Sequence, residues 1–597
     1  MKKYLLLLLT VCLLFPPAAD ADGSRSTGWT VYAPAGGSVR NDLQNKKEFE
    51  AERNRLFDAY RNRLSFRSGE LSSGRIVMDG YTMDVFMQQI GQPGPSGYPV
   101  YICLHGGGWD LPTQLEQFDV MKYYYAWEIT SGLCIVPRAI VTGGEEHYWP
   151  ESFRFYDRII EDAVLFHNAD PNRVYLLGFS SGGDGVYAIA PLIPDRLAAA
   201  EMCAGGPPHF QFKNMYSLPF RIRMGENDFA YGRNKSAARA DGVLNDLHSR
   251  YGGYPHQTLL HIGGSHNEWN ESPSGMSRVY TGSSVQKWLN GGKPSAATVN
   301  SRSIAWLRAY SRKPLPKKVV WDTGAYAAMR KTRGLYWLDR DGLLDRVTVV
   351  ASYNKKDNSV TVEKCDAERG TLKILLNPDM LDVFRPVKVK IAGSQVTVRP
   401  AVSRRIMEST LEVRGDKQMI FTSEIDITFD ASARRITVQA AEDYTADYSA
   451  YDRDRLLFWN EDGVFFVDER LFGLTPSELG SLLGVRLSEP EYWPHWGYGL
   501  YWTWLDAGNG SSVIFMFYEG RSVLIYSEKV GALTRSLRQA IRNEYTNEWH
   551  VLTNGGLLHY YADNNPYDGK GHTVQHYQSI RYVFDRDWDS GFARNNN

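Results

Sequence analysis

The sequence predicts a multidomain chain that begins with an α/β domain, built on a mostly parallel sheet covered by helices. Two observations lead to this fold class. Short apolar runs alternate with helix-like stretches up to about residue 270, and short alternating strands without helices follow from about residue 345. The second pattern is typical of a β-sandwich-like module, and a small α+β domain is expected after it. We place these three domains at residues 22–344, 345–442 and 443–597.

Residues 1–21 have the features of a signal peptide. Two lysines precede an apolar run at residues 4–15, and small residues at 19 and 21 form a cleavage site. That run is too short to cross about 30 Å of hydrocarbon as a helix. Cys12 follows Val11 rather than a small residue, which argues against a lipid anchor. We therefore expect an exported chain, secreted or periplasmic, without a transmembrane segment.

Charge and cysteine content exclude several classes of partner. The net charge of −1 gives no electrostatic basis for binding nucleic acid or an anionic membrane. The spacing of the four cysteines that remain after cleavage fits neither a disulfide framework nor a metal site. Three of them lie in short apolar runs, where a free cysteine behaves as a small hydrophobic residue. The four are Cys103, Cys134, Cys203 and Cys365.

The α/β domain is predicted to begin with a helix and a hairpin. Apolar residues recur at helical spacing among charged ones over 41–64, which predicts an amphipathic helix. The stretch RIVMDGYTMDVFMQQ predicts two strands joined at Asp79-Gly80, a strong hairpin signal. Six apolar runs separated by helix-like stretches then predict the parallel sheet. These runs are YPVYICL, GLCIVPR, RVYLLG, AAAEMCA, PFRIRMG and QTLLHIG.

The β-sandwich-like module is predicted from seven short runs between residues 345 and 442. They are RVTVVASY, NSVTVEKC, TLKILLN, PVKVKIAG, SQVTVRP, STLEVRG and MIFTSEIDITF. The last two flank Arg414-Gly415-Asp416, a tripeptide of the adhesion type. Because it lies between two strand-like runs, we expect a hairpin turn there rather than a receptor ligand.

The C-terminal domain offers no clear chemistry. Thr475 to Glu478 form a capping box that opens a helix. The histidines His550, His559, His572 and His576 are scattered, so surface or core positions are expected rather than a metal site. Four tryptophans either stack on sugars or polymer chains, giving surface contact, or fill the core of the domain. They are Trp493, Trp496, Trp502 and Trp504.

The main chemical signal is Gly178-Phe179-Ser180-Ser181-Gly182, which fits G-x-S-x-G between an apolar strand and a helix. This pattern is typical of a nucleophile elbow, in which small flanking residues let the backbone turn sharply and present the serine hydroxyl. Alone it is weak, because glycine and serine are common in loops.

A second glycine-rich stretch, HGGGW at residues 105–109, follows the strand YPVYICL. Without Cβ atoms, its main-chain N–H groups can approach a substrate carbonyl. We expect an oxyanion hole formed by Gly106, Gly107, Gly108 and the N–H of Ser181. The alternative is an ordinary glycine-rich turn.

An acid and a histidine follow the next strands in the order Ser180, Asp228, His266. This chain order is that of the serine–acid–histidine triad in this kind of fold. Glu226 is the alternative acid, but it lies nearer the end of its strand. His261 is the alternative base, but it lies within a strand-like run.

Asp184 is expected to interact with the dipole of the helix after the elbow, without a catalytic role. Its position in the first helical turn suits a negative charge.

Residues 98–340, about 40% of the chain, resemble the α/β-hydrolase superfamily, specifically secreted esterases similar to polyhydroxybutyrate depolymerases. The matching stretches are HGGGW, VPRA at 136–139, YDRIIEDAVLF, DPNRVYLLGFSSGGDGVY, GENDFAYGRNK, RKPLPKKVVW and LYWL at 335–338. The resemblance implies a Ser-Asp-His hydrolase without cofactor or metal. GGSHNEW departs from the family pattern after the histidine, on the leaving-group side of the pocket.

The expected activity is hydrolysis of a small or polymeric carboxylic ester through an acyl-enzyme. A serine peptidase of the same fold is the alternative enzyme, since fold does not fix function. A surface-binding protein with an inactive hydrolase domain is the alternative outside enzymes. All proposed catalytic positions hold competent residues, whereas almost half of the chain lies outside that domain.

Overall fold

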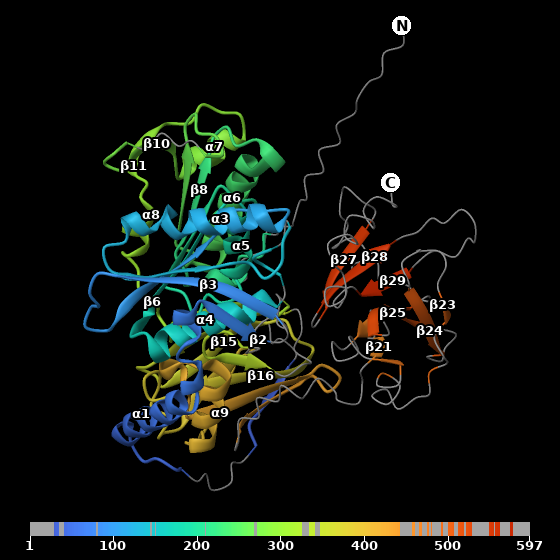
Figure 1. Cartoon of the computed structure of the whole chain (residues 1–597). Coiled ribbons are helices and arrows are strands. Elements are labelled where there is room, and N and C mark those ends of the chain that lie inside the picture. The colour runs from blue at the N-terminus through green and yellow to red at the C-terminus, as the bar shows by residue number, and fades with distance from the viewer. Residues whose placement is uncertain are drawn as a thin grey trace.

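The computed structural model describes residues 29–34 and 41–441 apart from short gaps, and beyond 441 mainly the backbone of strands (Figure 1). The gaps are 79–80, 144–145, 150, 209, 268–271, 325–333 and 341–346. The predicted signal peptide at residues 1–21 lies outside the described residues.

A ten-stranded sheet forms the α/β domain, in the order β11-β10-β9-β8-β7-β6-β4-β5-β3-β2. The six central strands from β5 to β9 run parallel, and antiparallel strands extend both edges. All six predicted apolar runs lie in these parallel strands, so the predicted α/β class is confirmed. The strands are β2 (Arg75–Met78), β3 (Tyr81–Ile90), β4 (Tyr98–Leu104), β5 (Gly132–Pro137), β6 (Ala169–Phe179), β7 (Ala199–Cys203), β8 (Phe220–Gly225), β9 (His256–His261), β10 (Met276–Tyr280) and β11 (Ala297–Asn300).

Helices cover both faces of this sheet because successive side chains of a strand point to opposite sides. In β4, Tyr101 and Cys103 pack under α3 (Leu111–Tyr124) and α8 (Ser303–Leu307). The alternate residues Val100, Ile102 and Leu104 face a second core. That core includes α4 (Ser152–Phe166), α5 (Ser181–Ile189) and α6 (Arg233–Tyr251). Short helices α2 (Glu70–Ser73) and α7 (Ser283–Leu289) complete the layer.

The predicted burial of three cysteines is confirmed. Cys103, Cys134 and Cys203 are free thiols in the core beneath α3 and α8, while Cys365 is a half-buried free thiol. They therefore act as small hydrophobic residues, as their apolar neighbours predict.

Two five-stranded sheets share a further core, in the orders β1-β20-β19-β16-β13 and β12-β14-β15-β17-β18. Their strands are β1 (Thr30–Tyr32), β12 (Lys318–Asp322), β13 (Leu338–Arg340), β14 (Thr348–Asn354), β15 (Ser359–Cys365), β16 (Arg369–Leu376), β17 (Val387–Ile391), β18 (Ser394–Val398), β19 (Ser423–Asp430) and β20 (Arg435–Ala440). Strands from before residue 344 thus pair with strands after it: β12 pairs with β14, and β13 with β16. We call these two sheets and their helices the β module.

Two helices far apart in the sequence belong to the β module. Helix α1 (Lys46–Arg63) agrees with the predicted amphipathic helix and buries Phe49, Leu56 and Phe57 in this core. Helix α9 (Arg404–Arg414) lies beside it (Figure 1).

The predicted strand STLEVRG is wrong, because its residues belong to α9. Read from residue 404, the segment buries Ile406, Met407, Thr410 and Leu411, which is helical spacing. Ser403 caps the helix by accepting a hydrogen bond from the N–H of Ile406. The run STLEVRG starts at residue 409, in the middle of α9, and is too short to show the helical period.

The Arg414-Gly415-Asp416 tripeptide is buried at the end of this helix and joins the β module to the α/β domain. Gly415 ends α9 with φ 60°. The Asp416 carboxylate accepts a hydrogen bond from Arg312 at 2.5 Å and lies 3.5 Å from Arg196. A hairpin turn is therefore wrong, and burial of both charged residues excludes an exposed adhesion ligand.

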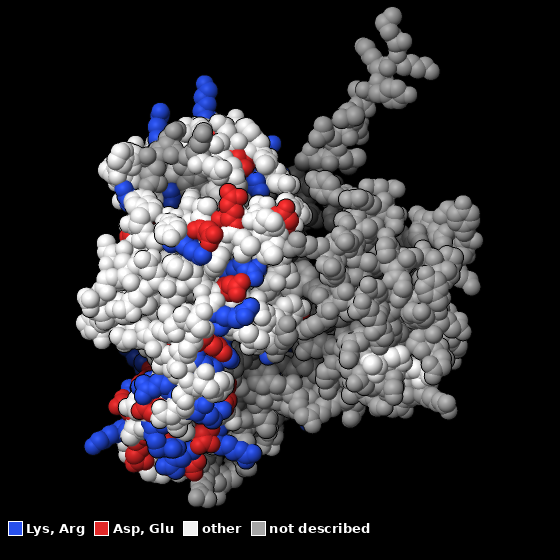
Figure 2. Space-filling view, in the orientation of Figure 1, with Lys and Arg blue, Asp and Glu red and all other residues white. Residues whose placement is uncertain are grey.

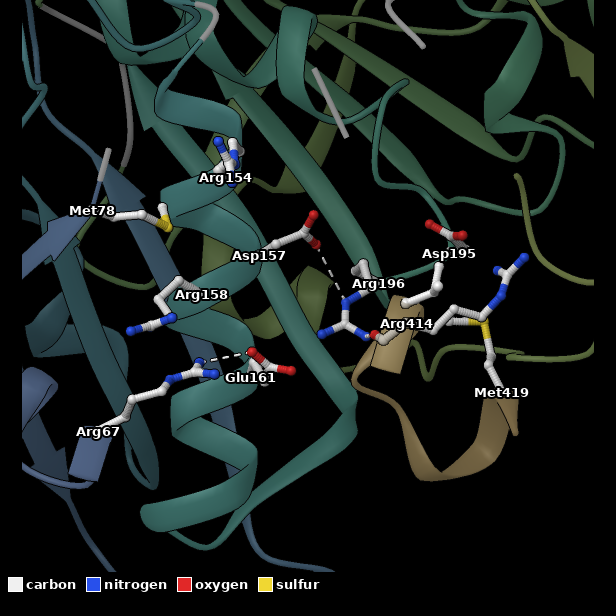
Figure 3. A pocket seen from close by; sticks show the side chains of 11 residues that line it. Arg67, Met78, Arg154, Asp157, Arg158, Glu161, Asp195, Arg196, Arg414 and Met419 are labelled. Atoms are coloured by element: carbon white, nitrogen blue, oxygen red, sulfur yellow. Dashed lines mark hydrogen bonds and ion pairs between the residues drawn. The ribbon is translucent and has the colours of Figure 1, made fainter. Parts of the chain in front are cut away.

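A pocket of about 180 Å³ lies at this junction (Figure 3). Arg196 lies between Asp157 of α4, at 3.6 Å, and the main-chain carbonyl of Arg414, to which it donates at 3.0 Å. Arg67 pairs with Glu161 of α4 at 2.7 Å. Charged side chains from both parts of the chain therefore line the pocket in compensating pairs.

Figure 2 shows Lys, Arg, Asp and Glu interspersed over the part of the molecule that holds α1 and α9. Pairs within α1, such as Arg55–Glu52, contribute to this pattern. The charges on this face therefore do not separate into a patch of one sign. Among the helices that the structure describes, none combines the length and the apolar character needed to cross a membrane.

Beyond residue 441 the described backbone forms a seven-stranded sheet in the order β23-β24-β25-β26-β29-β28-β27 and a pair, β21-β22. The strands are β21 (Leu457–Trp459), β22 (Phe465–Val467), β23 (Glu491–Tyr492), β24 (Leu500–Asp506), β25 (Ser512–Tyr518), β26 (Arg521–Ser527), β27 (Glu548–Thr553), β28 (Gly556–Tyr561) and β29 (Thr573–His576). Trp502 and Trp504 lie in β24, and Trp493, Trp496, His572 and the second half of the predicted capping box (477–478) lie outside the described residues. His550, His559 and His576 lie in β27, β28 and β29.

We predict that a chain ending at residue 441 folds, whereas a chain ending at residue 344 does not. The shorter chain leaves β12 and β13 without the strands they pair with and exposes the core that α1 helps to form. Size-exclusion chromatography and thermal unfolding would compare the two. A monomeric, cooperatively unfolding chain of residues 22–344 would contradict the prediction.

We also predict that Asp416→Asn lowers the free energy of unfolding by about 3–5 kcal/mol at neutral pH, because it leaves buried arginines without their counter-charge. Burial raises the pKa of Asp416, but Arg312 and Arg196 together hold it below its usual value. The carboxylate therefore stabilises the fold at neutral pH, and the difference between variant and wild type should shrink as pH falls through the depressed pKa.

Urea unfolding would measure this difference. Glu363→Gln, which breaks the more exposed Lys318–Glu363 pair, is the control and should cost less than about 1 kcal/mol. An equal loss in the free energy of unfolding for the two variants would show that the buried Asp416 pairs stabilise the fold no more than an exposed ion pair does.

Candidate active site

The candidate site lies where the strand order of the sheet reverses. Strand β4 lies between β5 and β6, so the chain leaves β4 toward one side of the sheet and later returns on its other side. The loops after adjacent parallel strands then diverge, and a crevice opens at the carboxyl ends of these strands. The glycine-rich loop at residues 105–108 follows β4, and Ser180 follows β6. The topology therefore brings these two sequence motifs together.

Ser180 lies in a strained turn between β6 and α5. Its backbone has φ 57° and ψ −120°, a conformation that residues with a side chain rarely adopt. Its N–H donates to the carbonyl of Cys203 at 2.9 Å, and its carbonyl accepts the first hydrogen bond of α5 from Asp184. The turn is thus held from the neighbouring strand β7 and from the helix.

Both flanking glycines are required by close backbone contacts. A Cβ on Gly178 would overlap the carbonyl oxygen of Gly182, and a Cβ on Gly182 would lie 2.6 Å from the carbonyl oxygen of His105. No side chain fits at these distances. The two glycines of the G-x-S-x-G pattern therefore permit the turn that exposes Ser180.

The structure brings Ser180, His266 and Asp228 into hydrogen-bond distance. The Nε2 atom of His266 lies 3.0 Å from Oγ of Ser180, and its Nδ1 atom lies 2.6 Å from Oδ2 of Asp228. Because a carboxylate only accepts, Nδ1–H donates to Asp228 and leaves Nε2 to accept the proton of the serine hydroxyl. The Asp228 side chain is buried, and that of His266 is 31% exposed.

The loops that carry Asp228 and His266 are hydrogen bonded to each other. The N–H of Asn227 donates to the carbonyl of Gly264 at 2.7 Å, and that of Gly263 donates to Oε2 of Glu226 at 2.9 Å. The other carboxyl oxygen of Glu226 accepts a hydrogen bond from Trp288 at 3.1 Å. Glu226, the alternative acid, therefore holds the histidine loop and does not contact His266.

His261, the alternative base, lies buried within β9. Burial, with the nearby charges of Arg223 and Arg221, lowers its pKa to about 2. An imidazole that stays neutral at all ordinary pH values and lies inside the sheet is not placed to receive the proton of Ser180.

The predicted oxyanion loop packs directly on the elbow. A Cβ on Gly107 would lie 3.0 Å from Cβ of Ser181, so these two residues are in close contact. A Cβ on Gly106 or Gly108 would approach Gln117 and Gln114 of α3 instead. The structure thus brings Gly107 and Ser181 together, while the neighbouring glycines let the loop lie against α3.

Two buried histidines hold the predicted oxyanion loop by hydrogen bonds to its main chain. His105 Nδ1–H donates to the carbonyl of Gly106 at 2.7 Å, and its Nε2 accepts the N–H of Ala139 at 3.1 Å. His147 Nε2–H donates to the carbonyl of His105 at 2.9 Å. Burial lowers the pKa of His105 to about 4 and that of His147 well below its usual range. Both rings are therefore neutral supports.

His105, Glu146 and His147 place possible ligand atoms within 4.8 Å of one another, the one such group in the described part of the chain. Both nitrogens of His105 and the Nε2 of His147 already take part in hydrogen bonds to the main chain. A metal ion would have to break these bonds, so the arrangement fits support of the loop better than metal binding.

Two carboxyl groups of the site have contacts that the sequence does not reveal. Asp184 lies in the first turn of α5, as predicted, and its half-buried carboxyl group accepts the N–H of Gly206 at 2.6 Å, which holds the loop after β7. Burial raises its pKa to about 7. Glu146 lies near Gly107 and Ser181, and no sequence pattern marks it.

Aromatic side chains surround the site. The Phe179 ring lies 5.2 Å from that of His266 and 5.3 Å from that of Tyr124. Trp109, directly after the oxyanion loop, is 80% exposed, and Phe229, next to Asp228, is also exposed. Apolar groups of a substrate would find contact surface here.

We predict that Ser180→Gly is more stable than Ser180→Ala by about 1 kcal/mol, because glycine adopts this backbone conformation without strain. Urea unfolding of the two variants would measure the difference. Ser249→Gly and Ser249→Ala, at an exposed position of α6, are the controls. There the alanine variant should be the more stable one, because alanine favours a helix. A more stable alanine variant at position 180 would contradict the strained turn.

No protein family and no curated protein matches the sequence. Solved structures resemble parts of the chain. A thermostable esterase is 16% identical with a TM-score of 0.28, covering 40% of this chain and 64% of its own. The LpqC poly(3-hydroxybutyrate) depolymerase from Bordetella parapertussis is 16% identical with a TM-score of 0.27, covering 41% and 97%. An alpha-beta serine hydrolase homologue from Coxiella burnetii is 15% identical with a TM-score of 0.24, covering 32% and 87%.

Proposed function

We propose that the chain is a serine hydrolase that cleaves carboxylic esters through a triad of Ser180, His266 and Asp228. The observation that carries the proposal is the position of His266, hydrogen bonded on one side to a serine in a strained elbow and on the other to a buried carboxylate. A serine hydroxyl becomes a useful nucleophile when an adjacent base can take its proton. This arrangement supplies such a base in the required tautomer.

In the proposed mechanism, Ser180 Oγ attacks the ester carbonyl while His266 Nε2 removes its proton. Asp228 orients the imidazole and stabilises its charged form. The alcohol leaves with the proton from His266, and the acyl group remains on Ser180. Water, deprotonated by the same histidine, then releases the acid and restores the serine.

Main-chain N–H groups of Gly107 and Ser181 are the proposed donors to the oxyanion, with Gly106 and Gly108 in the same loop. Support comes from the contact between Gly107 and Ser181, which places both residues beside the nucleophile. Donors fixed in advance stabilise the charge that develops on the carbonyl oxygen, and one such donor is worth about 10²–10³ in rate.

The substrate is proposed to be a small or polymeric ester, without a cofactor. The aromatic surface of Phe179, Tyr124 and Trp109 would contact its apolar part.

Substitution of the triad tests the proposal. Ser180→Ala should lower the turnover of a nitrophenyl acetate substrate by about 10⁴-fold or more and abolish labelling by a fluorophosphonate probe. Asp228→Asn should cost about 10⁴-fold, because the histidine loses its orientation. Glu226→Gln is the matched control; it weakens the hydrogen bonds to Gly263 and Trp288 without touching His266, and it should cost less than about tenfold. Full activity of Ser180→Ala would contradict the proposed function.

A further inference from the structure

Glu146 is a buried carboxyl group beside the oxyanion loop that the mechanism above does not use. It comes from the segment between β5 and α4. Its Oε1 atom lies 3.4 Å from the point where a Cβ of Gly107 would lie, and Cβ of Ser181 lies 3.0 Å from the same point. The carboxyl group therefore adjoins the two residues whose N–H groups are the proposed oxyanion donors.

Its position is fixed by neighbours that are themselves buried or paired. Oε2 of Glu146 accepts a hydrogen bond from the Gln114 side chain at 3.0 Å. Gln114 is buried in α3, and its own carbonyl oxygen accepts from Arg138 at 2.8 Å. The carbonyl of Gly108 in turn accepts the N–H of Gly143, from the same segment as Glu146, at 3.2 Å. Glu146 thus belongs to the packing that shapes the oxyanion loop.

We propose that Glu146 is a positioning residue of the oxyanion loop that must be uncharged while the ester is attacked. The proposal rests on the proposed function, because it concerns the charge that develops when Ser180 adds to a carbonyl. A negative charge at Glu146 would repel the oxyanion across a short, water-poor distance and would compete for the N–H groups that should bind it. A neutral carboxyl of the same shape supports the loop without that repulsion.

Burial keeps this carboxyl neutral over part of the physiological range. It raises the pKa of Glu146 to about 7, although interactions with the Gln114 and Ser181 side chains and with the Gly108 backbone oppose the rise. The uncharged form is therefore present below about pH 7, and the charged form appears as pH rises through that value. Activity should accordingly fall on the alkaline side.

The other titratable and charged groups around Glu146 come from each element packed against it. His105 after β4 and His147 beside it stay neutral, because burial lowers the pKa of both rings. Burial raises the pKa of Tyr156 in α4 far above the assay range. Arg138 supplies a fixed positive charge on this side of the site. Its guanidinium donates to the carbonyl oxygen of Gln114, whose amide group in turn donates to Glu146.

Asp184 in α5 is the one described neighbour that titrates in the same range, because burial raises its pKa to about 7. It holds the loop after β7 through Gly206, and its negative charge contributes to the raised pKa of Glu146. Asp184→Asn is therefore the matched comparison for Glu146→Gln.

The test is the pH profile of kcat for phenyl acetate between about pH 5 and 9, followed by acid release. In the wild type, kcat should fall about tenfold or more above a midpoint near pH 7. Glu146→Gln keeps the shape of the side chain without its charge and should remove this decline. Asp184→Asn should keep it and move it to slightly lower pH, because the negative charge of Asp184 raises the pKa of Glu146. On the acid side of the profile, the three proteins should show the same pH dependence.

Gln114→Met provides a second variant that does not alter Glu146 itself. It removes a hydrogen bond that favours the charged carboxyl, so the alkaline decline should move to higher pH, by about half a unit or more. Persistence of the decline in Glu146→Gln, its loss in Asp184→Asn, or an equal loss of activity at every pH would overturn the role of Glu146. Activity that survives in Ser180→Ala would instead overturn the proposed function, so the two failures are distinguishable.

Discussion

The site depends on the close approach of three strand ends, which only glycine permits. A Cβ on Gly182 would lie 2.6 Å from the carbonyl oxygen of His105, and a Cβ on Gly183 would lie 2.6 Å from that of Cys203. The start of α5 can therefore lie directly against the ends of β4 and β7. This contact fixes the elbow of Ser180, whose N–H is bound by Cys203, and it brings the oxyanion loop against Ser181. The strain at Ser180 persists because these contacts on both sides hold the turn.

The acidic side chains of the site differ in their polar partners and in how far they are removed from water. Asp228 accepts a hydrogen bond from His266 at 2.6 Å and has the guanidinium of Arg233 3.7 Å away. Glu146 is buried and Asp184 is half-buried, each with main-chain or amide partners, and desolvation raises the pKa of each to about 7. Carboxyl groups of one site can therefore differ in protonation because their surroundings differ.

Local patterns were sufficient to predict the strands of the parallel sheet and to select Ser180, Asp228 and His266, because each of these residues follows a recognisable strand in a glycine-containing loop. Glu146 could not be selected in this way. Its position beside Gly107 results from packing between two loops, and the two adjacent glutamates in EEHYW form no periodic or spaced pattern. The hydrogen bond of Asp184 with Gly206 likewise depends on the loop after β7, which the sequence of α5 does not reveal.

Long-range pairing explains why the predicted domain limits do not follow the observed sheets. The texture of the sequence changes near residue 345, but β12 lies before that point and pairs with β14 after it. Helix α1 lies almost 300 residues before the start of that texture, yet it packs in the β module. α9 was predicted as a strand because a short window hides a helical period. These contacts join segments far apart in the chain, and composition along the chain does not reveal them.

The β module and the oxyanion loop are linked through one helix. Glu161 of α4 accepts a hydrogen bond from Tyr60 of α1 and pairs with Arg67, and Gly415 after α9 leaves no room for a side chain against it. One turn earlier, Tyr156 of α4 donates to the carbonyl of His147 at 2.9 Å. His147 in turn donates to the carbonyl of His105, at the start of the oxyanion loop. Helix α4 therefore contacts the β module at one end of this chain of hydrogen bonds and helps to hold the loop after β4 at the other. An α/β domain that lacked the β module would lose the contacts that hold α4 from outside, although every proposed catalytic residue lies within it.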